Sequence, residues 1–192
     1  MSYKIIQPPF TLQFREMSKD ELRQYFAWFL EVMPERLNAL REAVSATQGF
    51  EELVLDGSTQ SLKGLGDWFV AAVEVRGRTA DEINEIQSRS KHNITVPDTE
   101  LSNRTFSIAM DIGMYFARVM LLTHPHLNWE QPLKDKKFVD YGQPILIGAG
   151  RVPLNPVRLM VILAYGFVSK AQKGSRLAEI FEYWSRQATT TL

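Results

Sequence analysis

Helical periodicity dominates the pattern of apolar and polar residues in the first 50 positions. Ser18 and Glu21 form a capping box, and apolar residues then repeat every three or four positions, at Leu22, Tyr25, Phe26, Phe29 and Met33. Pro34 suits the first turn of a new helix. A narrower apolar stripe follows it, formed by Leu37, Leu40 and Val44. The pattern therefore predicts two helices, one on each side of Pro34.

The same periodicity predicts four further helices, over approximately residues 61–76, 79–92, 100–123 and 156–170. A last helix follows, capped by Ser175, with an inward stripe formed by Leu177, Ile180, Phe181 and Trp184. Glycines in the helix over residues 61–76 indicate that this helix packs closely against a neighbouring backbone. The helix over 79–92 is mostly polar, so we expect it to lie on the outside. The helices over 100–123 and 156–170 are almost wholly apolar, and such helices are normally buried. We therefore expect them to form the centre of the fold.

Two regions show patterns that are typical of strands. Phe10, Leu12 and Phe14 alternate with polar residues after a pair of prolines, which predicts a short half-buried strand near the N-terminus. Residues 127–133 and 138–147 are rich in aromatic and β-branched residues, and the charged segment 134–137 separates them. These two segments predict a small hairpin.

The sequence thus predicts a mainly α fold. About seven helices surround two central apolar helices, with a small β-hairpin or minor sheet at one side. The chain has 192 residues with 45% hydrophobic and 23% charged side chains, which suits a single globular domain over residues 1–192 with a short frayed C-terminal tail.

Charge and cysteine content narrow the classes of function. The chain carries 22 basic and 22 acidic residues, so no overall field favours nucleic acid or an anionic membrane. It has no cysteine, which excludes disulfides and thiolate chemistry and fits a reducing compartment. The first 14 residues do not resemble a secretory signal, and charges interrupt both long apolar helices. We expect a soluble, cytoplasmic protein.

One group of polar residues interrupts the most apolar predicted helix. Asp111, Tyr115 and Arg118 are spaced i, i+4 and i+7, which places them on one side of that helix, where both charges would be buried. They are a candidate site for binding a polar ligand or for acid–base chemistry. The alternative is a structural network in which Asp111 and Arg118 contact other helices and Tyr115 satisfies one of them.

Other motifs point only weakly to chemistry. His124 and His126 could contribute to a metal site with His92 or Glu130, but a histidine near a helix C-terminus needs no metal to be favourable. Gly148 and Gly150 superficially resemble a dinucleotide-binding turn, yet the third glycine is missing, so a plain turn with positive φ is expected. No metal or cofactor is predicted.

The N-terminal third is acidic. Residues 1–60 have a net charge of −3, and Trp28 lies off the main apolar stripe near Glu31, Glu35 and Glu42. Such a tryptophan beside acidic residues would be a reasonable anchor for a basic protein partner. The alternative is a solvated face with a helix buried on two sides. A second cluster, which is basic, consists of Lys170, Lys173 and Arg176.

These observations lead to two hypotheses. The first is a non-catalytic protein-binding module, for example an inhibitor or an immunity-type partner, whose interaction surface includes Trp28 and the acidic residues near it. The rival is a small-molecule binding protein or cofactor-free enzyme built around Asp111, Tyr115 and Arg118. No catalytic motif has the spacing that its chemistry requires, so the first hypothesis is preferred.

Overall fold

The computed structural model describes residues 3–90 and 94–190, and it is mainly helical. Within these residues there are six helices: α1 (Lys19–Ser45), α2 (Ser61–Ala72), α3 (Ala80–Arg89), α4 (Asn103–Thr123), α5 (Pro156–Val168) and α6 (Arg176–Thr190). Four short strands accompany them: β1 (Val75–Gly77), β2 (Thr99–Leu101), β3 (Asn128–Glu130) and β4 (Ile145–Ile147). The prediction of a mainly α fold with a minor β component is confirmed.

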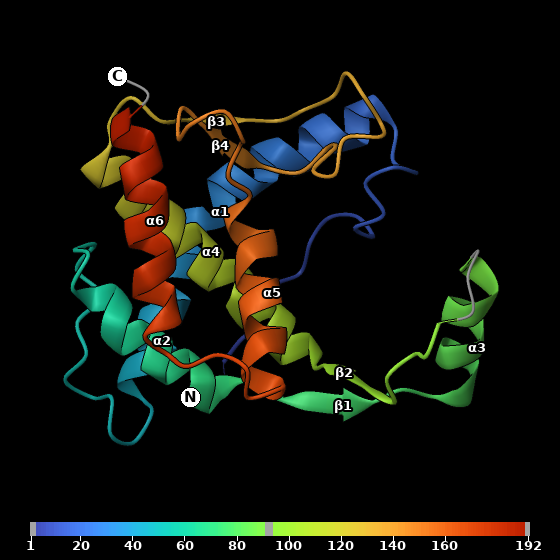
Figure 1. The fold of residues 1–192 in the computed structure, drawn as a ribbon, viewed down its shortest axis with the longest axis horizontal. Coiled ribbons are helices and arrows are strands. Elements are labelled where there is room, and N and C mark those ends of the chain that lie inside the picture. Colours follow the sequence, from blue (N-terminus) through green and yellow to red (C-terminus); the bar gives the residue numbers. More distant parts are fainter. Residues whose placement is uncertain (1–2, 91–93, 191–192) are drawn as a thin grey trace.

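The centre of the fold is α4. Ser102 caps it by accepting a hydrogen bond from the Thr105 amide, and fourteen of its 21 residues are buried. Its most extensive contacts are with α5, and the two helices lie side by side in Figure 1. α1 packs against another side of α4, while α6 contacts both α4 and α2. The expected central position of the 100–123 segment is therefore confirmed.

The predicted count of about seven helices is wrong because α1 is continuous. Pro34 lies inside this 27-residue helix and does not begin a new one. A proline inside a helix removes one backbone hydrogen bond and crowds the preceding turn. Here Phe29 lies on one side of Pro34, Leu37 and Leu40 lie on the other, and all three are buried in the same core. Burial of both halves offsets the cost of the proline.

The predicted close packing of a glycine is confirmed where α2 meets the start of α6. A Cβ atom added to Gly66 would lie 2.0 Å from the carbonyl oxygen of Gly174. Only glycine permits this approach, and it brings Leu65 and Leu177 into the core with no exposed surface.

The β structure consists of two separate antiparallel pairs. β3 pairs with β4, with Trp129 opposite Leu146, so the predicted hairpin over residues 127–147 is confirmed. β1 pairs with β2, with Arg76 opposite Glu100, and the sequence analysis did not predict this pair. The predicted N-terminal strand is wrong, because the Glu16 amide donates to the Gln13 carbonyl in a turn. An isolated period-two pattern does not form a strand without a neighbour to pair with.

Within residues 3–90 and 94–190, one helix, α4, is long and apolar enough to cross a membrane by length and composition, with a mean hydropathy of 1.4 over an 18-residue window. Of that window, 78% is buried inside the protein. This is the environment of a core helix in a soluble protein, which is consistent with the expectation of solubility.

Candidate functional site

Among the residues that the structure describes, one ion pair has both partners buried. Asp111 on α4 is 0% exposed and Arg36 on α1 is 2% exposed. Nε of Arg36 donates to Oδ1 of Asp111 over 2.9 Å, and Nη2 donates to Oδ2 over 2.8 Å. This two-point contact matches the planar guanidinium to the planar carboxylate. The pair therefore links α1 to the central helix.

Tyr3 and Ser107 complete the surroundings of this pair. The Tyr3 hydroxyl donates to Oδ2 of Asp111 and accepts from Nη2 of Arg36 over 2.9 Å. Ser107 Oγ lies 2.9 Å from the Tyr3 hydroxyl and accepts from the Ile6 amide over 2.8 Å. The N-terminal segment is thereby attached to α4. Both carboxylate oxygens have partners inside the protein, so the cluster offers no vacant polar atom to a ligand at Asp111.

Burial sets the protonation behaviour of this cluster. It raises the pKa of the Asp111 carboxyl, although the hydrogen bonds from Arg36 and Tyr3 oppose that shift. Burial, followed by the charge of Asp111, raises the pKa of the Tyr3 phenol well above its usual range. Tyr3 therefore remains protonated at neutral pH and serves as a hydrogen-bond donor.

Tyr115 has a different set of partners. Its hydroxyl lies 2.6 Å from Ser61 Oγ and accepts from the Gly57 amide over 2.8 Å. These contacts attach α4 to the start of α2. Tyr115 is fully buried, and its single hydroxyl group is occupied by two structural hydrogen bonds.

The structure does not bring Asp111, Tyr115 and Arg118 into one pocket. Arg118 is exposed, so the expected burial is confirmed for Asp111 and wrong for Arg118. The three residues share one side of α4, but different segments cover that side along its length. α1 covers Asp111 and the start of α2 covers Tyr115. Arg118 lies farther along α4, and its Nε is 3.8 Å from the position that a Cβ atom at Gly57 would take.

The two candidate metal-binding histidines lie at the end of α4. His124 Nε2 is 2.7 Å from Ser185 Oγ on α6, and its ring centroid is 5.9 Å from that of His126. Burial, followed by the charge of His126, lowers the pKa of His124. Within residues 3–90 and 94–190, no three histidine or carboxylate side chains gather into a metal-binding group. His92, a third ligand considered from the sequence, lies outside the described residues.

The glycine-containing turn after β4 has the expected backbone. Gly148 and Gly150 have φ values of +99° and +91°. Both values lie in the region that favours glycine, so the expected positive φ is confirmed. The turn precedes Asn155, whose side chain accepts from the Arg158 amide and caps α5 as expected.

The acidic residues near the N-terminus lie along the exposed side of α1. Glu31, Glu35 and Glu42 are all exposed, and Oε1 of Glu35 lies 3.7 Å from Nζ of Lys4. Trp28 is only half-exposed and packs against the core, with its ring centroid 5.5 Å from that of Tyr25. The acidic face is present, but Trp28 contributes more to the core than to a protruding anchor.

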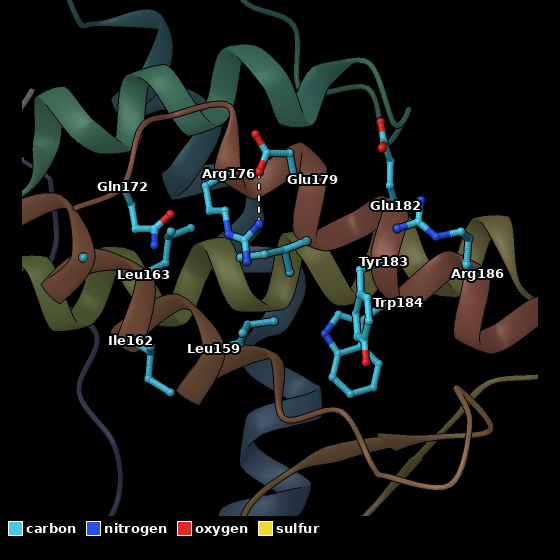
Figure 2. Close-up of a pocket in the computed structure, with 12 residues that line it drawn as sticks. Leu159, Ile162, Leu163, Gln172, Arg176, Glu179, Glu182, Tyr183, Trp184 and Arg186 are labelled. Atoms are coloured by element: carbon cyan, nitrogen blue, oxygen red, sulfur yellow. Dashed lines mark hydrogen bonds and ion pairs between the residues drawn. The ribbon is translucent and has the colours of Figure 1, made fainter. Parts of the chain in front are cut away.

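The sequence analysis missed a groove between α5 and α6. It has a volume of about 590 Å³, and Leu159, Ile162 and Leu163 contribute apolar lining (Figure 2). The lining also contains four charged residues from α6: Arg176, Glu179, Glu182 and Arg186. On α6, Tyr183 and Trp184 stand next to each other, with ring centroids 5.7 Å apart. A second hollow of about 430 Å³ shares both aromatic residues and extends to the glycine turn. We call the α5–α6 hollow the apolar groove.

The apolar groove exists because α5 is buried on only one side. Met160, Leu163, Ala164 and Phe167 are buried, whereas Ile162, which lines the groove, is 59% exposed. Tyr165 and Val168 are 39% and 38% exposed on another part of α5. The expectation that the 156–170 segment lies at the centre is therefore only half correct. A helix that is apolar on all sides but covered on one side leaves an apolar surface. The lack of polar residues around α5 was the signal that could have revealed the groove.

Comparison with known proteins adds no family assignment. No protein-family model, curated protein or solved structure matches this chain.

Proposed function

We propose that this protein is a non-catalytic protein-binding module that contacts its partner through the apolar groove. The observation that carries this proposal is the exposed apolar lining of the groove, in which Ile162 on α5 is 59% exposed and Tyr183 on α6 is 51% exposed. Contiguous apolar surface on a soluble protein commonly marks an interaction site. If this apolar surface stayed uncovered, it would also favour non-specific association of the protein.

The composition and shape of the groove support a macromolecular partner. Tyr183 is 51% exposed, and Trp184 beside it is partly buried. Tyrosine and tryptophan are enriched among the residues that contribute most to protein interfaces. The groove runs along two helices, α5 and α6, and its lining residues lie between them in Figure 2. An elongated groove between two helices suits an amphipathic protein segment.

The charges that line the groove are balanced. Arg176 and Arg186 line it together with Glu179 and Glu182, and Nη1 of Arg176 pairs with Oε2 of Glu179 over 3.0 Å. The apolar part of the lining is therefore what a partner would cover. An amphipathic helix presents an apolar stripe on one face. We therefore propose an amphipathic helix as the bound segment.

The alternative of a ligand-binding or catalytic site around Asp111 has less support. Both oxygens of Asp111 are bonded to Arg36 or Tyr3, and the Tyr115 hydroxyl is bonded to Ser61 and Gly57. Arg118 does not join them. The cytoplasm is the proposed location, because a chain without cysteine suits a reducing compartment.

Site-specific photo-crosslinking tests the proposal. A benzophenone amino acid replaces Ile162 in the apolar groove, and a matched variant carries it at Val54, which is 70% exposed and lies outside the groove. After irradiation of the cells that produce the protein, we expect a discrete protein adduct at position 162 and none at position 54. A second copy of this chain would count as a protein partner. Equal labelling at both positions, or no protein adduct at position 162, would overturn the proposal.

A further inference from the structure

The second hollow, between α6 and the turn that follows β4, differs in character from the apolar groove. It has a volume of about 430 Å³ and is lined by residues 149–152 on the turn and by Tyr183, Trp184 and Gln187 on α6. Sites for small molecules in proteins have volumes of about 300–1,000 Å³, so this hollow is large enough to hold one. We call it the turn pocket.

A single unpaired cation marks the turn pocket. Among the described residues that line it, Arg151 is the only charged one. The Arg151 side chain is exposed, and it forms no ion pair or hydrogen bond with the described part of the chain. In the apolar groove, by contrast, two arginines are matched by two glutamates. Because the planar guanidinium fits a carboxylate at two points, an unpaired arginine beside a hollow favours an anion there.

The turn also carries backbone groups without partners. Ala149 is 2% exposed, yet neither its amide nor its carbonyl has a hydrogen-bond partner among residues 3–90 and 94–190. The amides of Gly150 and Arg151 likewise donate to no acceptor in those residues. Buried backbone amides in folded proteins are nearly always paired. An acceptor in the turn pocket, which Ala149 itself lines, would supply the missing partner.

The fold holds the turn at both ends and against α6. The Leu146 amide donates to the Leu154 carbonyl over 2.8 Å, and the Leu154 amide donates back to Leu146 over 2.9 Å. At the middle of the turn, a Cβ atom added to Gly150 would lie 3.5 Å from Cβ of Gln187 on α6. The two sides of the turn pocket are therefore positioned by the protein itself, which reduces the entropy that a ligand loses on binding.

Two aromatic side chains form the wall of the turn pocket on α6. The ring planes of Tyr183 and Trp184 lie at 85° to each other, with centroids 5.7 Å apart, so the two rings make a corner. A planar ring in such a corner contacts the face of one aromatic ring and the edge of the other, and aromatic pairs prefer both arrangements. The pocket thus combines aromatic surface with a cation and unpaired amides.

We propose that the turn pocket binds a small aromatic carboxylate, with the carboxylate at Arg151 and the turn amides and the ring against Tyr183 and Trp184. One arginine matches the single negative charge of a carboxylate, whereas a phosphate monoester carries up to two. This inference goes beyond the proposed function and does not rest on it. The proposed function is tested at position 162 of the apolar groove, whereas the ligand site depends on Arg151.

Titration of the full chain with phenylacetate, followed through the ¹H–¹⁵N chemical shifts of its amides, tests the proposal. We expect saturable shifts at residues 148–151. Three further probes separate the parts of the ligand: phenylacetamide lacks the charge, acetate lacks the ring, and phenyl phosphate carries additional negative charge. Each should bind at least tenfold more weakly than phenylacetate. Tighter binding of phenyl phosphate or of phenylacetamide would overturn the assignment to a carboxylate.

Matched arginine variants locate the site. Arg151→Gln removes the charge at the turn pocket and should raise the Kd for phenylacetate at least tenfold. Arg118→Gln, at an exposed arginine outside the turn pocket, is the control and should leave the Kd within about twofold of the wild type. The absence of saturable shifts at residues 148–151 up to about 10 mM phenylacetate, or equal Kd values for Arg151→Gln and the wild type, would overturn the proposal. Photo-crosslinking at position 162 would still decide the proposed function separately.

Discussion

Replacing Asp111 with alanine should destabilise the protein severely, because it leaves a buried guanidinium without its counter-charge. The Arg36 side chain is 3% exposed and cannot reach water without rearrangement of α1. After the substitution, the nearest remaining acceptors are Tyr3 Oη at 2.9 Å and Ser107 Oγ at 3.4 Å, neither of which is charged. The guanidinium keeps its proton under these conditions, so the cost cannot be avoided by neutralisation.

The size of the effect follows from the burial of both partners. Removing one partner of a buried ion pair typically costs about 3–5 kcal/mol. For a chain of this length, each 1 kcal/mol lowers the Tm by about 2–4 °C. We therefore expect Asp111→Ala to lower the Tm by about 6–20 °C.

Thermal unfolding followed by circular dichroism, together with urea denaturation, measures this loss. Arg118→Ala is the matched control, because it removes an exposed charge from the same helix and should change the stability by less than about 0.5 kcal/mol. The double variant Arg36→Met with Asp111→Leu replaces the whole pair by apolar side chains. It should regain most of the stability that Asp111→Ala loses, since no unpaired charge remains.

Two results would refute this reasoning. A Tm for Asp111→Ala within about 2 °C of the wild type would correspond to less than about 1 kcal/mol and would mean that Arg36 does not depend on the carboxylate. A double variant as unstable as the single one would mean that the loss comes from packing and not from the unpaired charge.

Two further predictions concern the α4–α5 contact and the helix α3. Gly113→Ala should destabilise the protein by about 1–3 kcal/mol in urea denaturation, because the new Cβ atom would lie 2.8 Å from Val157 Cα. Gly77→Ala is the control and should be near neutral, since no atom lies within 4 Å of its Cβ position. Equal effects of the two substitutions would contradict close packing at Gly113. Arg76, through its hydrogen bonds, lowers the pKa of Glu82 from 4.5 to about 2. Because the pKa of Glu82 is depressed in the folded state, its contribution to the stability of α3 is present above pH 4.5 and is lost as the pH falls towards 2. NMR should show α3 losing its helical chemical shifts in that window before α4 does, and the reverse order would contradict this assignment.

The candidate site shows where sequence reasoning stops. Spacing alone places Asp111, Tyr115 and Arg118 on one side of a helix, and the structure agrees with that geometry. It does not reveal that α1 covers Asp111, that the start of α2 covers Tyr115, and that Arg118 remains exposed. The partner of Asp111 is Arg36, 75 positions earlier in the chain. Arg36 looked like one more charged residue on an amphipathic helix, so no local pattern could identify it.

The sequence by itself determined the helices, since capping boxes and a 3.6-residue apolar period are local properties that act before any long-range contact forms. It also determined the apolar character of α4 and α5, and the position of the β3–β4 hairpin. Only the tertiary structure decided that α1 continues through Pro34, that α4 is enclosed while α5 keeps an exposed apolar side, and that α3 projects from the body. Those outcomes depend on which surfaces meet, and burial is shared between segments far apart in the chain. A local pattern encodes how apolar a helix is, but not how much of it the rest of the chain can cover.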